Sequence, residues 1–117
     1  MKIVAVTACT VGVAHTYLAQ DQLIAAAKRR GDSIRVETQG TIGAENVLSE
    51  NEIKDANIVI FAADVAVSNE QRFKGKKIVR VKSEVAIKQP DKLLQKIADK
   101  LAGKDNVWNS KIFISMY

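Results

Sequence analysis

The chain has 117 residues, of which 47% are hydrophobic and 26% charged, as expected for one globular domain. Its single cysteine excludes an internal disulfide, and together with its single histidine it falls short of the usual ligand set of a structural zinc site. The net charge of +5 is spread along the sequence and only 5% of residues are aromatic, which argues against nucleic-acid binding. No apolar run is long enough for a membrane span, and the apolar start is too short for a signal peptide, so we expect a cytoplasmic protein without metal or cofactor.

The first half of the chain begins with a near-continuous apolar run at residues 2–8. This run is rich in β-branched residues, which predicts a strand buried on both faces of a sheet. After a glycine-containing loop, apolar residues at spacings of three and four predict a helix over residues 14–30 that ends at Gly31. Residues 33–38 alternate polar and apolar side chains, which is typical of a half-exposed strand near an edge, and residues 39–43 are predicted to be a loop.

The second half continues the alternation of helices and strands. Ser49 is the first residue of a Ser-x-x-Glu capping box and is expected to start a short helix. Further elements are expected in this order: a buried strand at 57–62, a helical turn at 70–73, a strand at 77–81, a helical turn at 85–88, and a helix from Pro90 that ends before Gly103. Alternating strands and helices indicate an α/β fold: a three-layer α/β/α sandwich with a four-stranded, mainly parallel, Rossmann-like sheet.

Residues 1–103 are predicted to form the domain and residues 104–117 a tail. The tail contains apolar residues at 107–108 and 112–114, but no turn residues connect them to the sheet. A fifth strand, a flap and a disordered end are therefore open alternatives for this segment.

Cys9 follows the first predicted strand and so lies at the carboxyl edge of the sheet, where ligands bind in such folds. The amides that open the next helix can stabilise a thiolate and hold a phosphate bonded to sulfur. We therefore expect Cys9 to be a nucleophile, with His15 supplying a hydrogen bond or positive charge and Thr16 a hydroxyl. The phosphate would be bound by the intervening loop, which consists of Thr10, Val11, Gly12, Val13 and Ala14.

The spacing from Cys9 to His15 and Thr16 matches the Cys-x5-Arg-Ser/Thr loop of tyrosine phosphatases, whose size suits a phosphate. His15 stands in place of the arginine, so the loop is expected to hold phosphate and pass it on rather than drive hydrolysis. A small cysteine phosphatase and a non-catalytic docking module remain alternatives, as do a core cysteine with a capping histidine and phosphorylation of His15 itself. A thiol oxidoreductase is disfavoured because the chain has no resolving cysteine.

The residues Val6-Thr7-Ala8-Cys9, Gly12 and Ala14-His15-Thr16 resemble the Cys-Pro-Thr-Gly-Ile-Ala-His-Thr loop of fructose-type enzyme IIB. This enzyme is the phosphocysteine subunit of the bacterial sugar phosphotransferase system. Other matching segments, which extend the resemblance over about residues 2–101, are 36–40, 42–43, 45–46, 53–64, 72–73 and 75–76. Three positions depart from the family pattern: Thr10 stands where the family has proline, Val11 where it has threonine, and Val13, a minor change, where it has isoleucine.

The resemblance implies that Cys9 takes phosphate from a phosphohistidine of enzyme IIA and passes it to a fructose-like sugar bound by the membrane component IIC. A monomer that acts at the inner face of the membrane through IIC is then expected. Gln39, Gly40 and Asp64 follow strands at the same edge as Cys9 and are expected to border the docking face, although Gly40 could simply form a turn. For Asp64 a structural or partner-contact role is favoured over a general acid, because a carboxylate next to a phosphate would be repelled.

Overall fold

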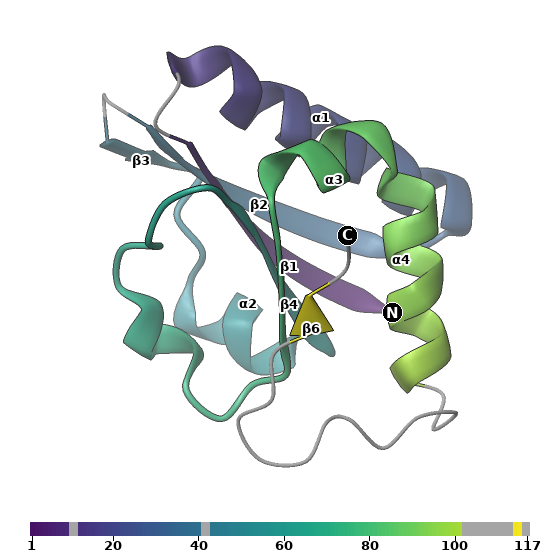
Figure 1. Ribbon diagram of the computed structural model, residues 1–117. Helices are drawn as coiled ribbons and strands as arrows, with labels where there is room; N and C mark the ends of the chain where they lie inside the picture. Colours follow the sequence, from purple (N-terminus) through teal and green to yellow (C-terminus); the bar gives the residue numbers. More distant parts are fainter. Residues whose placement is uncertain (10–11, 41–42, 102–113, 116–117) are drawn as a thin grey trace.

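The central feature of the protein is a sheet with the strand order β3-β2-β1-β4-β5-β6 (Figure 1). The computed structural model describes residues 1–9, 12–40, 43–101 and 114–115. Four strands run parallel to one another, namely β1 (Lys2–Ala8), β2 (Ser33–Gly40), β4 (Ile58–Ala63) and β5 (Ile78–Val81). These are the four strands predicted from the sequence, and they confirm a mainly parallel sheet.

The sheet is larger than the predicted four strands. β3 (Gly43–Glu45) pairs antiparallel with β2, and β6 (Ile114–Ser115) pairs parallel with β5. The predicted loop at 39–43 was therefore wrong at its ends, because Gln39 and Gly40 continue β2 and Gly43 starts the return strand. The return strand could not be predicted because three residues are too few to show an alternating pattern. It begins at Gly43, whose φ of +104° would be strained in a residue with a side chain.

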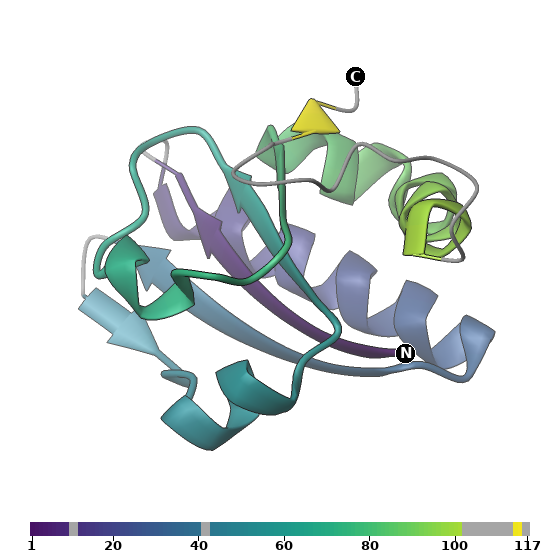
Figure 2. The same ribbon diagram turned by 90° about the horizontal axis from the view of Figure 1, so that it is seen from below.

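Helices cover both faces of the sheet, which confirms the three-layer arrangement (Figures 1 and 2). One face carries α1 (Gly12–Arg30), α3 (Ser83–Lys88) and α4 (Pro90–Asp99), and the other carries α2 (Glu50–Asp55) and the 3₁₀ turn η1 (Glu70–Phe73). The predicted turn at 85–88 is the second part of α3. Of the tail, residues 114–115 form a strand, while the predicted boundary at 103 lies outside the described residues.

Alternating residues of the central strands feed two separate cores, because successive side chains of a strand point to opposite faces. Ile3 and Ala5 of β1 join the core beneath α1, whereas Val4 and Val6 join the core beneath α2 and η1. The residues of α1 that face the sheet are mostly small, which lets the helix lie close to the strands. Its buried apolar residues are Ala19, Leu23, Ala26 and Ala27.

Both ends of α2 are stabilised by side chains. The predicted capping box is confirmed: Glu52 N–H donates to Ser49 Oγ at 3.1 Å, and Ser49 N–H donates to Glu52 Oε1 at 2.9 Å. At the other end, Lys76 Nζ donates to the carbonyl oxygens of Lys54 and Ala56 at 3.1 and 2.7 Å. These bonds satisfy backbone groups that the helix itself cannot pair.

Candidate active site

Cys9 and Asp64 lie next to each other at the carboxyl edge of the sheet. β1 and β4 are paired as far as Ala8 opposite Ala63, and Asp64 N–H then donates to the Ala8 carbonyl oxygen at 2.9 Å. This bond extends the pairing by one residue and places the two side chains together. The Cys9 thiol, which is only 6% exposed, donates to Asp64 Oδ2 with an Sγ–O distance of 3.2 Å.

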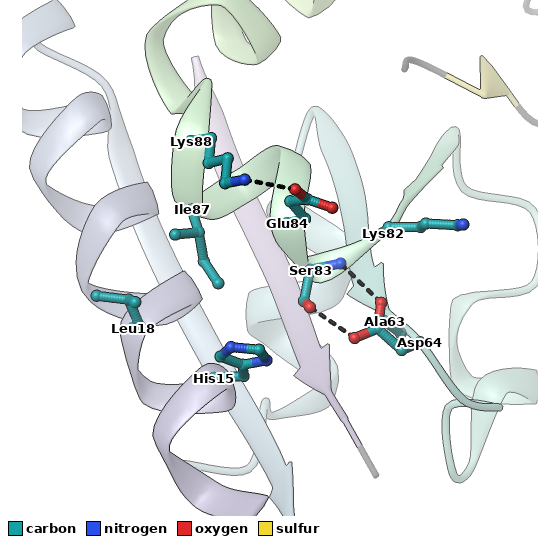
Figure 3. Close-up of a pocket in the computed structure, with 9 residues that line it drawn as sticks. All are labelled: His15, Leu18, Ala63, Asp64, Lys82, Ser83, Glu84, Ile87 and Lys88. Atoms are coloured by element: carbon teal, nitrogen blue, oxygen red, sulfur yellow. Dashed lines mark hydrogen bonds and ion pairs between the residues drawn. The ribbon is translucent and has the colours of Figure 1, made fainter. Parts of the chain in front are cut away.

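Ser83 holds the Asp64 carboxylate in this position (Figure 3). Its hydroxyl donates to Oδ2 at 2.6 Å, and its backbone N–H donates to Oδ1 at 3.0 Å. Ser83 is 3% exposed and lies at the start of α3, just after β5. Sequence reasoning missed this residue, although it follows a predicted strand at the same edge as Cys9 and Asp64, and that position was the available signal.

The Asp64 carboxylate is stabilised as an anion. Burial by itself would raise the pKa of Asp64, but the hydrogen bonds from Ser83 and Cys9 and the positive charge of His15 outweigh burial. The pKa of Asp64 is therefore lowered from its ordinary value of 3.8. At neutral pH this carboxylate is ionised and can only accept hydrogen bonds.

His15 and Thr16 occupy the start of α1 but differ in exposure. His15 is exposed and lines the same pocket as Asp64 and Ser83 (Figure 3). Thr16 is 1% exposed, and within the described part of the chain its Oγ1 has no hydrogen-bond partner. Its backbone oxygen accepts a hydrogen bond from Thr7 Oγ1 at 3.2 Å, which connects the start of α1 to the end of β1.

The predicted phosphate-binding loop is described only in part. Thr10 and Val11 lie outside the described residues. Gly12, Val13 and Ala14 belong to the first turn of α1, so the helix begins two residues earlier than predicted. Backbone N–H groups in the first turn of a helix have no intrahelical acceptor, and they suit an anion.

Gln39 and Gly40 are part of a neighbouring hydrogen-bonded framework. Gln39 Nε2 donates to Glu37 Oε2 at 2.8 Å and to the Ser68 carbonyl oxygen at 3.3 Å, while Gln39 Oε1 accepts from Ser68 N–H at 2.9 Å. Gly40 ends β2 opposite Gly43. These contacts connect β2 to the segment after β4.

A pocket of about 810 Å³ opens beside the Cys9–Asp64 pair, between α1, the end of β4 and α3 (Figure 3). Leu18 and Ile87 supply apolar walls, and Lys82 and Lys88 supply positive charge. Lys88 forms an ion pair with Glu84 at 2.6 Å. The pocket therefore combines apolar surface with charges of both signs next to the buried thiol.

Among the described residues, no helix combines the length and the apolar character that a membrane span requires. In the same part of the chain, no group of three or more His, Cys, Asp or Glu side chains is placed to hold a metal ion.

Residues 4–96 match the family described as the lactose/cellobiose-specific IIB subunit of the phosphotransferase system. The fructose-like EIIB component 2 of Escherichia coli is 48% identical over 101 residues, which cover 86% of this chain and 95% of that relative. The fructose-specific EIIABC component of Bacillus subtilis is 46% identical over 95 residues, which cover 81% of this chain but 15% of that longer protein.

Solved structures agree with these matches. A domain of the fructose-specific IIABC component of Borrelia burgdorferi has a TM-score of 0.77 and 51% identity, and the match covers 80% of this chain and 89% of that domain. A predicted fructose-specific IIB protein of Escherichia coli has a TM-score of 0.85 and 26% identity, and the match covers 98% of this chain and 97% of the other. The chain belongs to the enzyme IIB family of the sugar phosphotransferase system.

Proposed function

We propose that Cys9 is the phosphate carrier of this IIB protein. In this proposal Cys9 receives phosphate from a phosphohistidine of enzyme IIA and passes it to a fructose-like sugar bound by membrane component IIC. The protein would then be a protein-phosphocysteine–sugar phosphotransferase. The observation that carries the proposal is the position of the buried Cys9 thiol: Cys9 directly follows β1 at the carboxyl edge of the sheet, and α1 begins three positions later at Gly12.

The chemistry of two successive transfers explains this placement. In the first, Cys9 Sγ attacks phosphorus, the S–P bond forms, and the N–P bond to the donor imidazole breaks. In the second, a sugar hydroxyl attacks phosphorus and the sulfur leaves. Phosphoryl transfer depends mainly on positioning and on stabilising charge at the phosphate oxygens, which the amides of residues 12–14 and the buried Thr16 hydroxyl would do.

The partners in the proposal are supported by the composition of relatives. The Vibrio cholerae relative is named an EIIB'BC component and the Bacillus subtilis relative an EIIABC component, so each name joins a B part with a C part in one protein. We take the protein to work as a monomer at the inner face of the membrane through a separate IIC. The name of the Escherichia coli relative, a fructose-like EIIB component, supports a fructose-like sugar.

The proposal is tested by phosphorylating the protein with a defined donor. The isolated IIA part of the Bacillus subtilis EIIABC component is charged with phosphoenolpyruvate and the general phosphotransferase proteins, and then mixed with the parent chain or Cys9→Ser. We expect one phosphate on the parent, located on Cys9, and none on the variant. Intact-mass measurement counts the phosphate and peptide mass spectrometry locates it. The B part of the same EIIABC component serves as the positive control for the donor.

Three results would count against this role. An unmodified parent, alongside a modified positive control, would remove the carrier function. A phosphate that persists in Cys9→Ser would place it on another residue, His15 included. Continuous release of inorganic phosphate from an aryl phosphate would indicate a phosphatase instead.

Replacing His15 with alanine is expected to slow phosphate acceptance by about 10- to 100-fold, the value of one charge-assisted hydrogen bond. His15 is exposed, so thermal unfolding should stay unchanged. Rates are compared by rapid quench with the same donor, and Asp21→Ala, an exposed change on the same helix, is the matched control. Equal rates for His15→Ala and the parent would assign His15 a structural role only.

A further inference from the structure

The Cys9 thiol carries a proton that has to leave when sulfur becomes bonded to phosphorus. Among the described residues, Asp64 offers an acceptor in direct contact, with its Oδ2 3.2 Å from Sγ. We propose that Asp64 accepts this proton during phosphoryl transfer and that Ser83 positions the carboxylate for it. The proposal rests on the phosphate-carrying function of Cys9 and adds a second reacting group to it. It departs from the structural or partner-contact role expected from the sequence, because Asp64 contacts the thiol directly and a carboxyl group that has taken the thiol proton is neutral and does not repel the phosphate.

The hydrogen bonds around Asp64 fix which oxygen faces the sulfur. The Ser83 backbone N–H donates to Asp64 Oδ1 at 3.0 Å, and the Ser83 hydroxyl donates to Oδ2 at 2.6 Å. The backbone bond from Asp64 N–H to the Ala8 carbonyl oxygen fixes the carboxylate relative to β1, the strand that directly precedes Cys9. Because these three bonds set the position of Asp64, Oδ2 is held toward Sγ without a search through rotamers.

An acidic carboxylate can take a proton from a thiol because the transfer is late. As the S–P bond forms, the sulfur loses electron density and its proton becomes far more acidic than in the free thiol. Aspartate accepts a hydroxyl proton in the same way in protein kinases, where phosphoryl transfer is also mainly positioning and charge stabilisation. Burial alone would raise the pKa of Asp64, but the hydrogen bonds to its carboxylate outweigh burial and lower the pKa. The carboxylate is therefore unprotonated at neutral pH and able to accept a proton.

The step balances in atoms and charge. The S–P bond forms, the N–P bond of the donor phosphohistidine breaks, and the thiol proton moves to Asp64 Oδ2. The donor imidazole lies in line with the sulfur on the far side of phosphorus, and a ring that carries a proton on its other nitrogen leaves as neutral imidazole. The thiol proton therefore stays on Asp64 while the phosphate is bonded to sulfur. No oxidant, metal or further reactant enters the reaction.

Other charged groups around Asp64 set the electrostatic background for its pH dependence. His15 faces it from α1, and Lys82 and Glu84 flank Ser83 on the opposite wall of the pocket (Figure 3). His15 lowers the pKa of Asp64, whereas Asp64 and Glu84 repel one another as two carboxylates do. A variant that changes only Asp64 or Ser83 leaves these charges in place.

The test compares the parent with Asp64→Asn, using the phosphorylated Bacillus subtilis IIA part as donor and rapid quench to measure phosphate on Cys9. At about pH 7 we expect the variant to accept phosphate about 100-fold more slowly, the typical contribution of a general base. Its rate should then rise about tenfold per pH unit as bulk hydroxide ionises the thiol, while the parent stays flat. An Asp64→Asn rate equal to or above that of the parent, with the same flat profile, would overturn the proposal.

Ser83→Ala separates positioning from folding. Loss of the hydroxyl bond should raise the pKa of Asp64, so the acidic limb of the rate profile should move to higher pH, and Ser83→Thr should restore it. Circular dichroism and a cooperative thermal transition confirm that each variant is folded, and alkylation by iodoacetamide confirms that its thiol is still present and reactive. If Asp64→Asn does not fold, Ser83→Ala decides: an acidic limb at the same pH as in the parent overturns the proposal.

The two proposals fail in different ways. If the parent accepts no phosphate, Cys9 is not the carrier. If the parent and all variants accept phosphate at the same rate, only the role of Asp64 is refuted.

Discussion

Replacement of Arg72 with leucine should lower the free energy of unfolding by about 3–5 kcal/mol, as expected when one partner of a buried ion pair is removed. Glu37 is 1% exposed, and its two carboxylate oxygens accept from Arg72 Nη1 and Nη2 at 2.8 and 3.0 Å. Leu48 N–H also donates to Oε1 at 3.0 Å. Without Arg72 the carboxylate stays buried and loses its compensating charge.

This prediction carries a pH signature. Burial would raise the pKa of Glu37, but the hydrogen bonds from Arg72, Gln39 and Leu48 outweigh it and lower the pKa from its ordinary 4.5. In the parent, this group therefore stabilises the fold above about pH 4.5, and the contribution is lost as pH falls through the folded-state pKa. In Arg72→Leu burial dominates and protonation of Glu37 relieves the penalty, so the difference between parent and variant should shrink in acid.

Urea unfolding at about pH 7 and about pH 4 measures both effects. The double variant Glu37→Gln/Arg72→Leu is the matched control: it keeps an acceptor for Leu48 N–H but buries no charge, so it should be more stable than Arg72→Leu. A loss below about 1 kcal/mol at neutral pH, the range of surface ion pairs, would show that the pair contributes little.

Phe61→Ala is expected to cost about 3–5 kcal/mol, because it opens a cavity in the core beneath α2 and η1. The Phe61 ring is 1% exposed and meets Phe73 edge to face, with centroids 5.1 Å apart and planes at 78°. The Arg80 guanidinium carbon lies 4.9 Å from the centroid of the same ring. Alanine removes the packing, the aromatic pair and the cation–π contact together.

Unfolding in guanidinium chloride measures the free energy of unfolding of the parent and of Phe61→Ala. Phe61→Leu keeps most of the apolar volume, so its free energy of unfolding should fall clearly less. A double-mutant cycle with Phe73→Leu isolates the ring–ring contact, expected at about 0.5–1.5 kcal/mol beyond burial. Additivity of the two single changes would mean that the edge-to-face geometry adds nothing to the burial of each ring.

The elements predicted well from the sequence are those whose signal is local. β1 and β4 are continuous apolar runs, and the Ser49–Glu52 capping box is complete within four residues. The missing strands have too little sequence to show a period, since β3 has three residues and β6 has two. Cys9 was assigned to the carboxyl edge because that position follows from where its own strand ends.

The contacts of Cys9 could not be predicted because they depend on strand order and register. Asp64 is 55 positions from Cys9, and the two meet only because β4 lies beside β1 with Ala63 opposite Ala8. Ser83 reaches Asp64 because β5 is the next strand along. Neither neighbour relation is encoded in a short stretch of sequence, so the chemistry that joins these residues appears only in the folded chain.

The strand order also determines how a partner reaches the thiol. β1 lies between β2 and β4, and the chain leaves β1 through α1 on one face of the sheet but leaves β4 through η1 on the other. Connections that diverge in this way create a crevice at the sheet edge. The opening above Cys9 and Asp64 is thus built into the chain's path, and a descendant sequence that kept this path would keep the entrance even if its loops changed length and composition.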